Sequence, residues 1–346
     1  MKENGINFIR KNRIYLAAGF VVALIAIQLI FTPLQEFLKS IFILTLSLTF
    51  FFSLLAVSYY FFSGIHVISS ARWSENLTVI LKPVSKTIKY LLYFWLIVIA
   101  FSGAFISFPE NISSFRDFYF HPVFIYLRSI LFLILLVKLS DIPVKSEKTV
   151  LSFIIVFFAF SIFAYDWLLA IPAHHEINIL ILLMIINSLQ FGVGFVTLIT
   201  LQKNTFKSVG NDLRKYLLSL SFAWAYLSFS YLLIGWYSLQ TNETVFFKAL
   251  FESKLIVLFV LNILLNFVIP VSLLLLKRFH LKSKSALIAV YCIFSGKFND
   301  VLLIFITGFS IKLFSNFWLI SATVLTGFVF LKYVIVQAIE KINQAS

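Results

Sequence analysis

The chain has 346 residues, of which 61% are hydrophobic and 12% are charged, and its mean hydropathy is +1.00. Soluble domains are about 45–50% apolar and about 25% charged, so a soluble enzyme, a disordered chain and a disulfide scaffold are excluded. The single cysteine, Cys292, excludes an internal disulfide and a multi-cysteine zinc or iron–sulfur site. The net charge of +14 is better explained by basic loops beside membrane helices than by a nucleic-acid partner.

The sequence predicts an all-α integral membrane protein, because a helix needs about 20 apolar residues to cross the hydrocarbon. About ten transmembrane helices are expected in a single polytopic domain, at about residues 15–34, 41–63, 84–106, 122–141, 148–170, 175–201, 211–238, 254–279, 285–308 and 311–336. Of the 28 Lys and Arg residues, 21 fall on one side of these helices, five on the other and two inside helices. The positive-inside rule then places both termini in the cytoplasm. The N-terminal segment is predicted to be a retained helix, not a signal peptide.

Four ionisable residues stand out within the predicted helices, because a charge at the bilayer centre costs at least about 2.5–3.5 kcal/mol. Arg128 and Asp166 both fall in the outer third of the membrane, where they either form an interhelical salt bridge or line a wet cavity. Lys297 and Asp300 lie near the midplane with i,i+3 spacing on one helix. They are interpreted either as a self-neutralising pair or as a proton-accepting carboxylate tuned by an adjacent ammonium group.

Uncharged polar residues form stripes along three predicted helices. They are Asn187, Gln190, Gly194 and Thr197 in the sixth, Ser219, Tyr226, Ser230 and Tyr237 in the seventh, and Asn262 and Asn266 in the eighth. Such stripes serve either as hydrogen bonds between helices or as a hydrated proton path. Pro270 has no N–H group, so the carbonyl group of Asn266 needs a partner other than its usual helical one.

Histidines occur at two predicted helix starts. His121 precedes Pro122, and His174, His175 and Glu176 open the sixth helix. Adjacent histidines point about 100° apart on a helix, which disfavours a metal site built from both. The sequence also lacks the GxxxxGK[ST], GxGxxG, HExxH and CxxC motifs, so nucleotide binding and zinc hydrolysis have no support.

Several segments between about residues 60 and 310 resemble one family, in the same order along the chain. The first three are Ala-Arg-Trp-Ser at 71–74, His-Pro-Val-Phe at 121–124 followed by Arg128, and Asp-Trp-Leu at 166–168 followed by Pro172. The fourth lies in the seventh predicted helix and contains Asp-Leu-Arg-Lys at 212–215, Trp-Ala-Tyr at 224–226, Phe-Ser at 229–230 and Trp-Tyr at 236–237. The fifth contains Asn266 and Pro270, and then Gly296-x-x-x-Asp300. Together they resemble the ActF-like membrane subunits of alternative complex III, in the NrfD/PsrC-like superfamily. The chain departs from the family pattern after Pro172, where His174 and His175 stand in place of aromatic, serine and threonine residues.

The resemblance implies two four-helix bundles plus two extra helices in the bacterial inner membrane. It implies a quinol-oxidising respiratory complex that passes electrons to cytochrome c or to a terminal oxidase. The partners would be a homologous ActC-like subunit that takes the quinol, an iron–sulfur protein and c-type cytochromes, besides lipids. Those partners would hold the haem c and the iron–sulfur clusters, and this chain would hold no redox cofactor.

By the same resemblance, the chain is expected to offer a proton path or a scaffold. The candidate residues of an inner route are Asp212, Lys215, Tyr226, Ser230, Lys297 and Asp300, and those of an outer route are Asp166, Arg128, His121, His174 and His175. The alternatives are a stand-alone secondary transporter, favoured by the helix broken at Pro270 and by the midplane charges, and a purely structural membrane subunit. Tyr, Trp and His residues near both membrane faces permit quinone binding as well as interfacial anchoring.

Overall fold

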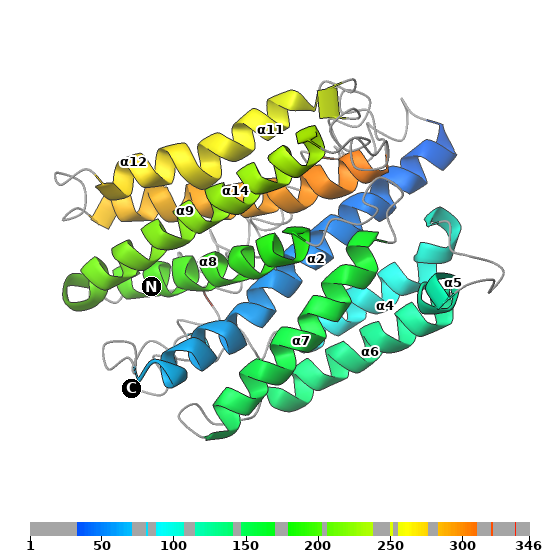
Figure 1. The fold of residues 1–346 in the computed structure, drawn as a ribbon, viewed down its shortest axis with the longest axis horizontal. Helices are drawn as coiled ribbons and strands as arrows, with labels where there is room; N and C mark the ends of the chain where they lie inside the picture. Colours follow the sequence, from blue (N-terminus) through cyan, green and yellow to red (C-terminus); the bar gives the residue numbers. More distant parts are fainter. Residues whose placement is uncertain are drawn as a thin grey trace, which may run out of the picture.

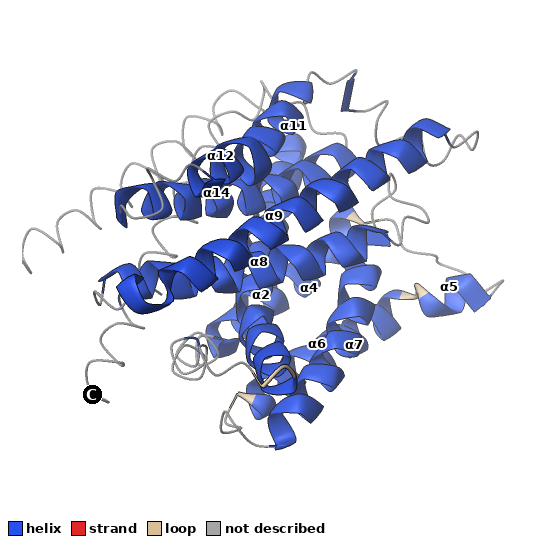
Figure 2. Cartoon of the chain, turned by 60° about the vertical axis from the view of Figure 1, so that its left-hand side comes forward, coloured by secondary structure: helices blue, strands red, loops and turns tan. Residues whose placement is uncertain are grey.

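The structure is a computed structural model that describes residues 33–70, 81, 88–106, 115–140, 147–169, 179–202, 206–237, 250–251, 255–275, 283–309, 320 and 336. Within these ranges every regular element is a helix (Figures 1 and 2). The elements are α2 (Leu34–Ile68), α4 (Ile88–Phe105), α5 (Phe115–Tyr119), α6 (Pro122–Leu139), α7 (Glu147–Leu169), α8 (Ile179–Gln202), α9 (Phe206–Tyr237), α11 (Ile256–Ile263), the π-helix η2 (Leu264–Val268), α12 (Ile269–Leu275) and α14 (Ser283–Gly308). The predicted all-α class is confirmed for the described part of the chain.

Seven spans among the described residues are long and apolar enough to cross a membrane. They are α2, α6, α7, α8, α9, the continuous run α11–η2–α12 and α14, while α4 contributes a shorter apolar stretch, Leu91–Phe105. These spans indicate a multi-pass membrane protein. Nearly all of the predicted spans 15–34 and 311–336 lie outside the described residues, so ten helices stay a prediction.

Two helices are longer than the apolar segments that predicted them. α2 has 35 residues where 41–63 was expected, and α9 has 32 residues where 211–238 was expected. At 1.5 Å per residue, α2 is about 52 Å long, against about 30 Å of hydrocarbon. Hydropathy marks the part of a helix in lipid, whereas the helical backbone continues past that part.

The long helix α2 runs through the middle of the molecule (Figure 1). It packs against α4 and α7 on one side and against α8 and α14 on the other. Several of its buried hydroxyl groups donate to carbonyl groups one turn back, as from Ser47 to Ile43 and from Ser53 to Thr49. These bonds satisfy the hydroxyl hydrogens inside an apolar environment, and Ser53 Oγ also accepts a hydrogen bond from Trp95 Nε1 of α4 at 2.9 Å.

The described helices have two sets of neighbours. α2 packs on α4 and α7, and α6 joins α4 and α7. α8 packs on α9 and α14, and the α11–η2–α12 run packs on α9 and α14. α8 is held close to its neighbours by glycines, because a side chain at Gly192 would meet Ser58 of α2 and one at Gly194 would meet Phe294 of α14. Small residues at such crossings allow helices in lipid to approach closely.

One end of the molecule is rich in positive charge. The C-terminal ends of α2, α6, α8 and α12 and the N-terminal ends of α7, α9 and α14 lie there, as contacts between these ends show. We call it the basic end because it carries Lys138, Lys148, Arg214, Lys215 and Lys284.

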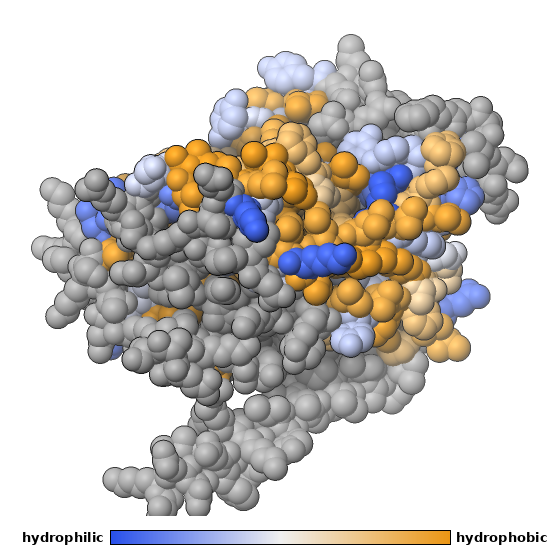
Figure 3. Space-filling view, turned by 90° about the horizontal axis from the view of Figure 1, so that it is seen from below, coloured by the Kyte–Doolittle hydropathy of each residue, from blue (hydrophilic) through white to orange (hydrophobic). Residues whose placement is uncertain are grey.

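Apolar side chains also cover much of the outside of the molecule. α4, α6 and α7 expose leucine, isoleucine, valine and aromatic side chains along their outer faces. In the view of Figure 3, apolar residues form a broad surface with few hydrophilic ones in it. Apolar surface on this scale suits contact with lipid.

Candidate functional site

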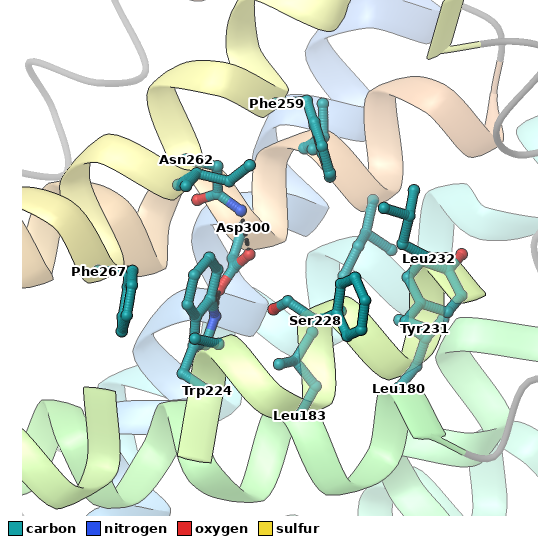
Figure 4. Close-up of a pocket in the computed structure, with 15 residues that line it drawn as sticks. Leu180, Leu183, Trp224, Ser228, Tyr231, Leu232, Phe259, Asn262, Phe267 and Asp300 are labelled. Atoms are coloured by element: carbon teal, nitrogen blue, oxygen red, sulfur yellow. Dashed lines mark hydrogen bonds between the residues drawn. The ribbon is translucent and has the colours of Figure 1, made fainter. Parts of the chain in front are cut away.

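The carboxylate of Asp300 lies at the meeting point of four helical segments. Its side chain is only 4% exposed. Oδ2 accepts hydrogen bonds from Trp224 Nε1 of α9 at 2.6 Å and from Asn187 Nδ2 of α8 at 3.1 Å. Oδ1 accepts a hydrogen bond from Asn262 Nδ2 of α11, and Figure 4 shows Asn262 and Trp224 converging on Asp300. Three N–H donors thus solvate a carboxylate inside the helices, as a buried charge requires.

The second charge of this cluster, Lys297, is fully buried one turn earlier on α14. Its ammonium group donates to Asn187 Oδ1 at 2.8 Å and lies 5.1 Å from the centroid of a Trp224 ring. The only ion pair within 4.0 Å among the described residues joins two other side chains, so Lys297 and Asp300 are not in direct contact. The amide of Asn187 connects them, since its oxygen accepts from the ammonium group and its nitrogen donates to the carboxylate.

The break predicted near Pro270 is present as a π-turn. η2 widens the helix just before Pro270, and the N–H group of Ile269 donates to the carbonyl of Leu264, five residues back. Asn266 lies in this turn, and its Nδ2 donates to Asn262 Oδ1 at 2.7 Å. The π-turn therefore places Asn266 behind Asn262, the donor to Asp300. π-turns inside α-helices occur often at functional sites.

The side chain of Asn266 fits against Gly296 of α14, where an added Cβ would lie 2.6 Å from Asn266 Cγ and Oδ1. We expect Gly296→Ala to displace Asn266 and lower the free energy of unfolding by about 1–3 kcal/mol, the usual cost of overpacking. Thermal unfolding of detergent-purified protein measures this. Gly103→Ala is the matched control, because its nearest contact is Tyr126 Oη at 3.8 Å. Equal stability of the two variants would show that Asn266 is not held in this position.

A cavity of about 230 Å³ lies beside Asp300, between α9 and α11. It is lined mainly by leucine, isoleucine and aromatic side chains of α8, α9, α11 and α14, with Ser228, Asn262 and Asp300 among the few polar ones (Figure 4). The carboxylate cluster is thus next to an apolar chamber.

Arg128 and Asp166 form a separate cluster between α6 and α7. Arg128 Nε and Nη2 donate to the two oxygens of Asp166 at 2.7 and 3.0 Å, and Nη2 also donates to the carbonyl of Tyr119 at 2.8 Å. The Asp166 side chain has no exposed surface and that of Arg128 is 25% exposed. Of the two interpretations left open by the sequence, the structure has the interhelical salt bridge, in its bidentate form.

Tyr119, the last residue of the short helix α5, packs against this ion pair from outside the membrane-spanning helices. Its ring lies 4.1 Å from the guanidinium carbon of Arg128. Burial, followed by the negative charge of Asp166, raises the pKa of Tyr119 to about 12. The phenol is protonated at neutral pH, so the guanidinium group lies against an uncharged ring.

The other predicted residues of the outer route have different settings. His121 precedes the first residue of α6, and its Nδ1 atom is buried with no hydrogen-bond partner among the described residues. His174 and His175 lie outside the described residues. The structure therefore links Asp166 to Arg128 and not, within the described chain, to a histidine.

The predicted inner route needs correction at Tyr226 and Ser230. Tyr226 is 71% exposed on the outer face of α9, and Ser230 Oγ on the same face donates to the carbonyl of Tyr226. Trp224 contacts Asp300 instead. Side chains two residues apart on a helix point about 200° apart around its axis, so Trp224 and Tyr226 face opposite ways.

Asp212 and Lys215 mark the basic end of α9, far from the carboxylate. Twelve residues separate Asp212 from Trp224, which is about 18 Å of helix. Lys215 is exposed, whereas Arg214 turns inward and donates to the carbonyl of Leu274 at 3.0 Å. Arg214, not Lys215, is the charged group that faces the other helices at this end.

The inward stripe of α9 was not among the predicted polar stripes. Ser221, Trp224, Ser228 and Tyr231 follow the spacing i, i+3, i+7 and i+10 and face α8, α11 and α14. Ser221 accepts from Gln190 of the predicted α8 stripe at 2.8 Å. The same helical spacing applied to this register would have found the stripe.

No known protein family and no curated protein matches the sequence.

Proposed function

We propose that this chain is a membrane subunit of a quinol-oxidising respiratory complex, similar to alternative complex III, and that it moves protons through the Lys297–Asn187–Asp300 cluster. It would hold no redox cofactor itself. A homologous ActC-like subunit, an iron–sulfur protein and c-type cytochromes, with a terminal oxidase as a further partner, would supply the quinol site, the haem c and the iron–sulfur clusters.

The observation that carries this proposal is the buried, amide-linked charge pair. Lys297 and Asp300 are both within a span long enough to cross a membrane, and neither has more than 4% of its surface exposed. Ionisable residues in such positions are costly and commonly mark ion or proton pathways. The Lys297 ammonium group and the Asp300 carboxylate can each exchange a proton. The Asn187 amide between them bonds to both and fixes their distance.

The resemblance to ActF-like subunits is supported by the meeting of two of its motifs. Trp224, from the seventh-helix segment, and Asp300, from the ninth-helix segment, are far apart in sequence and share a hydrogen bond. The two sets of helix neighbours are compatible with two four-helix bundles, to which predicted helices at about 15–34 and 311–336 would add two more. The basic end would then face the cytoplasm of the bacterial inner membrane, together with both termini.

The proposed inner route runs from the basic end, near Asp212 and Arg214, to Lys297 and Asp300. Thr197 and Ser285 lie beside Arg214 at its start. Of the proposed outer route, Asp166 and Arg128 would act as a structural ion pair. A role in proton transfer would need His174 or His175 beside them.

Purification of the chain through a tag in a mild detergent tests the assignment to a respiratory complex. We expect the eluate to contain partner subunits and to show haem c bands in a reduced-minus-oxidised spectrum. Because five histidines and one cysteine cannot readily hold such a set of cofactors in this chain alone, the bands would come from partners. A colourless, stable protein of 39.8 kDa would contradict the proposal.

A stand-alone secondary transporter is the second candidate, favoured by the π-turn before Pro270. Interrupted helices near the midplane line the substrate sites of many transporters. The same purification separates the two functions, since a transporter is stable and active without partners.

A further inference from the structure

The cavity beside Asp300 opens sideways, toward the lipid-facing surface of the helices. α9 packs on η2 and α12 but diverges from α11, and the cavity lies in the gap. Phe229 and Ile263, which line it, are 57% and 37% exposed on the apolar outside of the molecule. A molecule dissolved in the bilayer therefore reaches this cavity without crossing water.

The inner wall of the cavity carries two polar groups with unused hydrogen-bonding capacity. A carboxylate accepts about four hydrogen bonds. Among the described residues Asp300 accepts three, two at Oδ2 and one, from Asn262, at Oδ1. Ser228 Oγ is buried and has no hydrogen-bond partner among the described residues. Figure 4 shows Ser228 on the α9 side of the cavity, turned toward the region of Asp300 and Trp224.

The remaining walls are apolar and largely aromatic. Trp224, Phe229, Phe259 and Phe267 surround the polar wall, with leucines from α8 and α14 completing the chamber. A volume of about 230 Å³ is just below the range of small-molecule pockets. It suits one ring or a short head group whose tail continues through the side opening.

We propose that this cavity binds the hydroxyl head of a neutral, lipid-soluble molecule, with Asp300 accepting its hydrogen and Ser228 donating to its oxygen. A hydroxyl group supplies a donor and an acceptor on one atom, which matches the two groups. The carboxylate disfavours an anionic head, and Lys297 behind Trp224 disfavours a cationic one. The proposal goes beyond proton transfer and stands whether or not the chain belongs to a respiratory complex.

A matched pair of probes tests the inference: 4-decylphenol, and 4-decylanisole, in which a methyl group replaces the hydroxyl hydrogen. We measure binding of each to the full chain in nanodiscs, together with any subunits that purify with it. We expect the phenol to bind about tenfold more tightly, because only the phenol donates a hydrogen bond to a charged acceptor. Equal affinities for the two probes would overturn the proposal.

Variants on α9 locate the binding. Ser228→Leu fills the cavity and is expected to weaken 4-decylphenol binding at least tenfold, while Ser228→Ala weakens it only a few-fold, by removing one donor. Ser230→Leu is the matched control, because Ser230 lies on the outer face of the same helix and is expected to leave binding unchanged. If Ser228→Leu and Ser230→Leu bind alike, and both retain the wild-type unfolding temperature, the site is not this cavity.

The natural source of the hydroxyl group is identified by mass spectrometry of lipids that purify with the wild type and with Ser228→Leu. Selective depletion of an isoprenoid quinol in the variant would assign the cavity to a redox carrier. Selective depletion of a diacylglycerol-type lipid would assign it to a structural lipid. Both outcomes support the site, and neither depends on whether haem-containing partners are present.

Discussion

Replacing Arg128 with methionine is expected to destabilise the protein by about 3–5 kcal/mol, the usual cost of removing one partner of a buried ion pair. The substitution leaves Asp166, whose side chain has no exposed surface, without the bidentate bonds of 2.7 and 3.0 Å that neutralise it. Thermal unfolding of the purified protein in detergent measures the loss. It should appear as an earlier loss of the monodisperse peak on size-exclusion chromatography after heating.

The double variant Arg128→Met/Asp166→Asn separates the loss of the pair from the loss of the arginine. It removes both charges, and we expect it to recover most of the stability, because the buried carboxylate is no longer left alone. Arg128→Lys should recover less, since a lysine cannot make the bidentate contact. Lys148→Met, at the exposed basic end, is expected to change stability by less than about 0.5 kcal/mol. Wild-type stability in the single variant would mean that the pair does not hold α6 to α7.

The double variant also distinguishes a structural role of Asp166 from a proton-path role. If the proposed respiratory complex translocates protons normally with a stable double variant, the pair is assigned to structure alone. A stable double variant that loses translocation would restore Asp166 to the outer route.

Helix class and most helix positions follow from hydropathy, because the membrane requires long apolar segments with all backbone groups bonded internally. α6, α7 and α14 begin and end within two residues of their predicted limits. α2 and α9 do not, since residues outside the hydrocarbon are free to be polar and remain helical. The length of a helix and the length of its apolar segment are separate quantities.

Which side of a membrane helix points into the protein is harder to predict than where the helix lies in the sequence. On α9 the exposed stripe contains Tyr226 and Tyr237, which look polar in sequence, whereas the buried stripe contains Trp224, which looks apolar. Tyr237 is the last residue of α9, where a tyrosine with an apolar ring and a polar tip is favoured near the membrane surface. Tryptophan is buried here because its one N–H group has a carboxylate to bond. A prediction from residue polarity alone therefore places the exposed face of α9 in the interior.

The i,i+3 spacing of Lys297 and Asp300 suggested a direct contact that the structure does not have. The i,i+3 rule describes side chains that meet on a helix surface, but in the interior neighbouring helices supply competing partners. Asn187 of α8 bonds to both charges and separates them. Only the packing of α8 on α14 reveals this, although Asn187 already belonged to a predicted stripe.

Replacing Asp300 with asparagine is expected to cost more stability than replacing Lys297 with methionine. Asparagine offers one acceptor oxygen to the three N–H donors of Asn187, Trp224 and Asn262, and it leaves a fully buried ammonium group without its counter-charge. About 3–5 kcal/mol is expected for this change. Lys297→Met also removes a counter-charge, but it leaves the Asp300 carboxylate with all three of its N–H donors and takes one donor from Asn187 Oδ1, so a smaller cost of about 1–3 kcal/mol is expected.

The double variant Lys297→Met/Asp300→Asn completes a thermodynamic cycle. Because both residues bond to Asn187, we expect the effects to be non-additive by about 1–3 kcal/mol, with the double variant more stable than the sum of the single losses. Thermal unfolding of the four proteins in one detergent gives this interaction energy. Additive effects would mean that Asn187 does not couple the two charges.

Proton translocation by the proposed respiratory complex then tests the functional role of the same residues. Asp300→Asn removes the only carboxylate of the cluster, so we expect translocation to fall to the background level while quinol oxidation by the partner subunits continues at a reduced rate. Asp300→Glu keeps a group that exchanges protons and should retain part of the activity. The Lys297→Met/Asp300→Asn variant, if stable, should translocate no better than Asp300→Asn, because stability is recovered and the proton carrier is not. Normal translocation in Asp300→Asn would remove this cluster from the proton path and leave it as a structural junction of four helices.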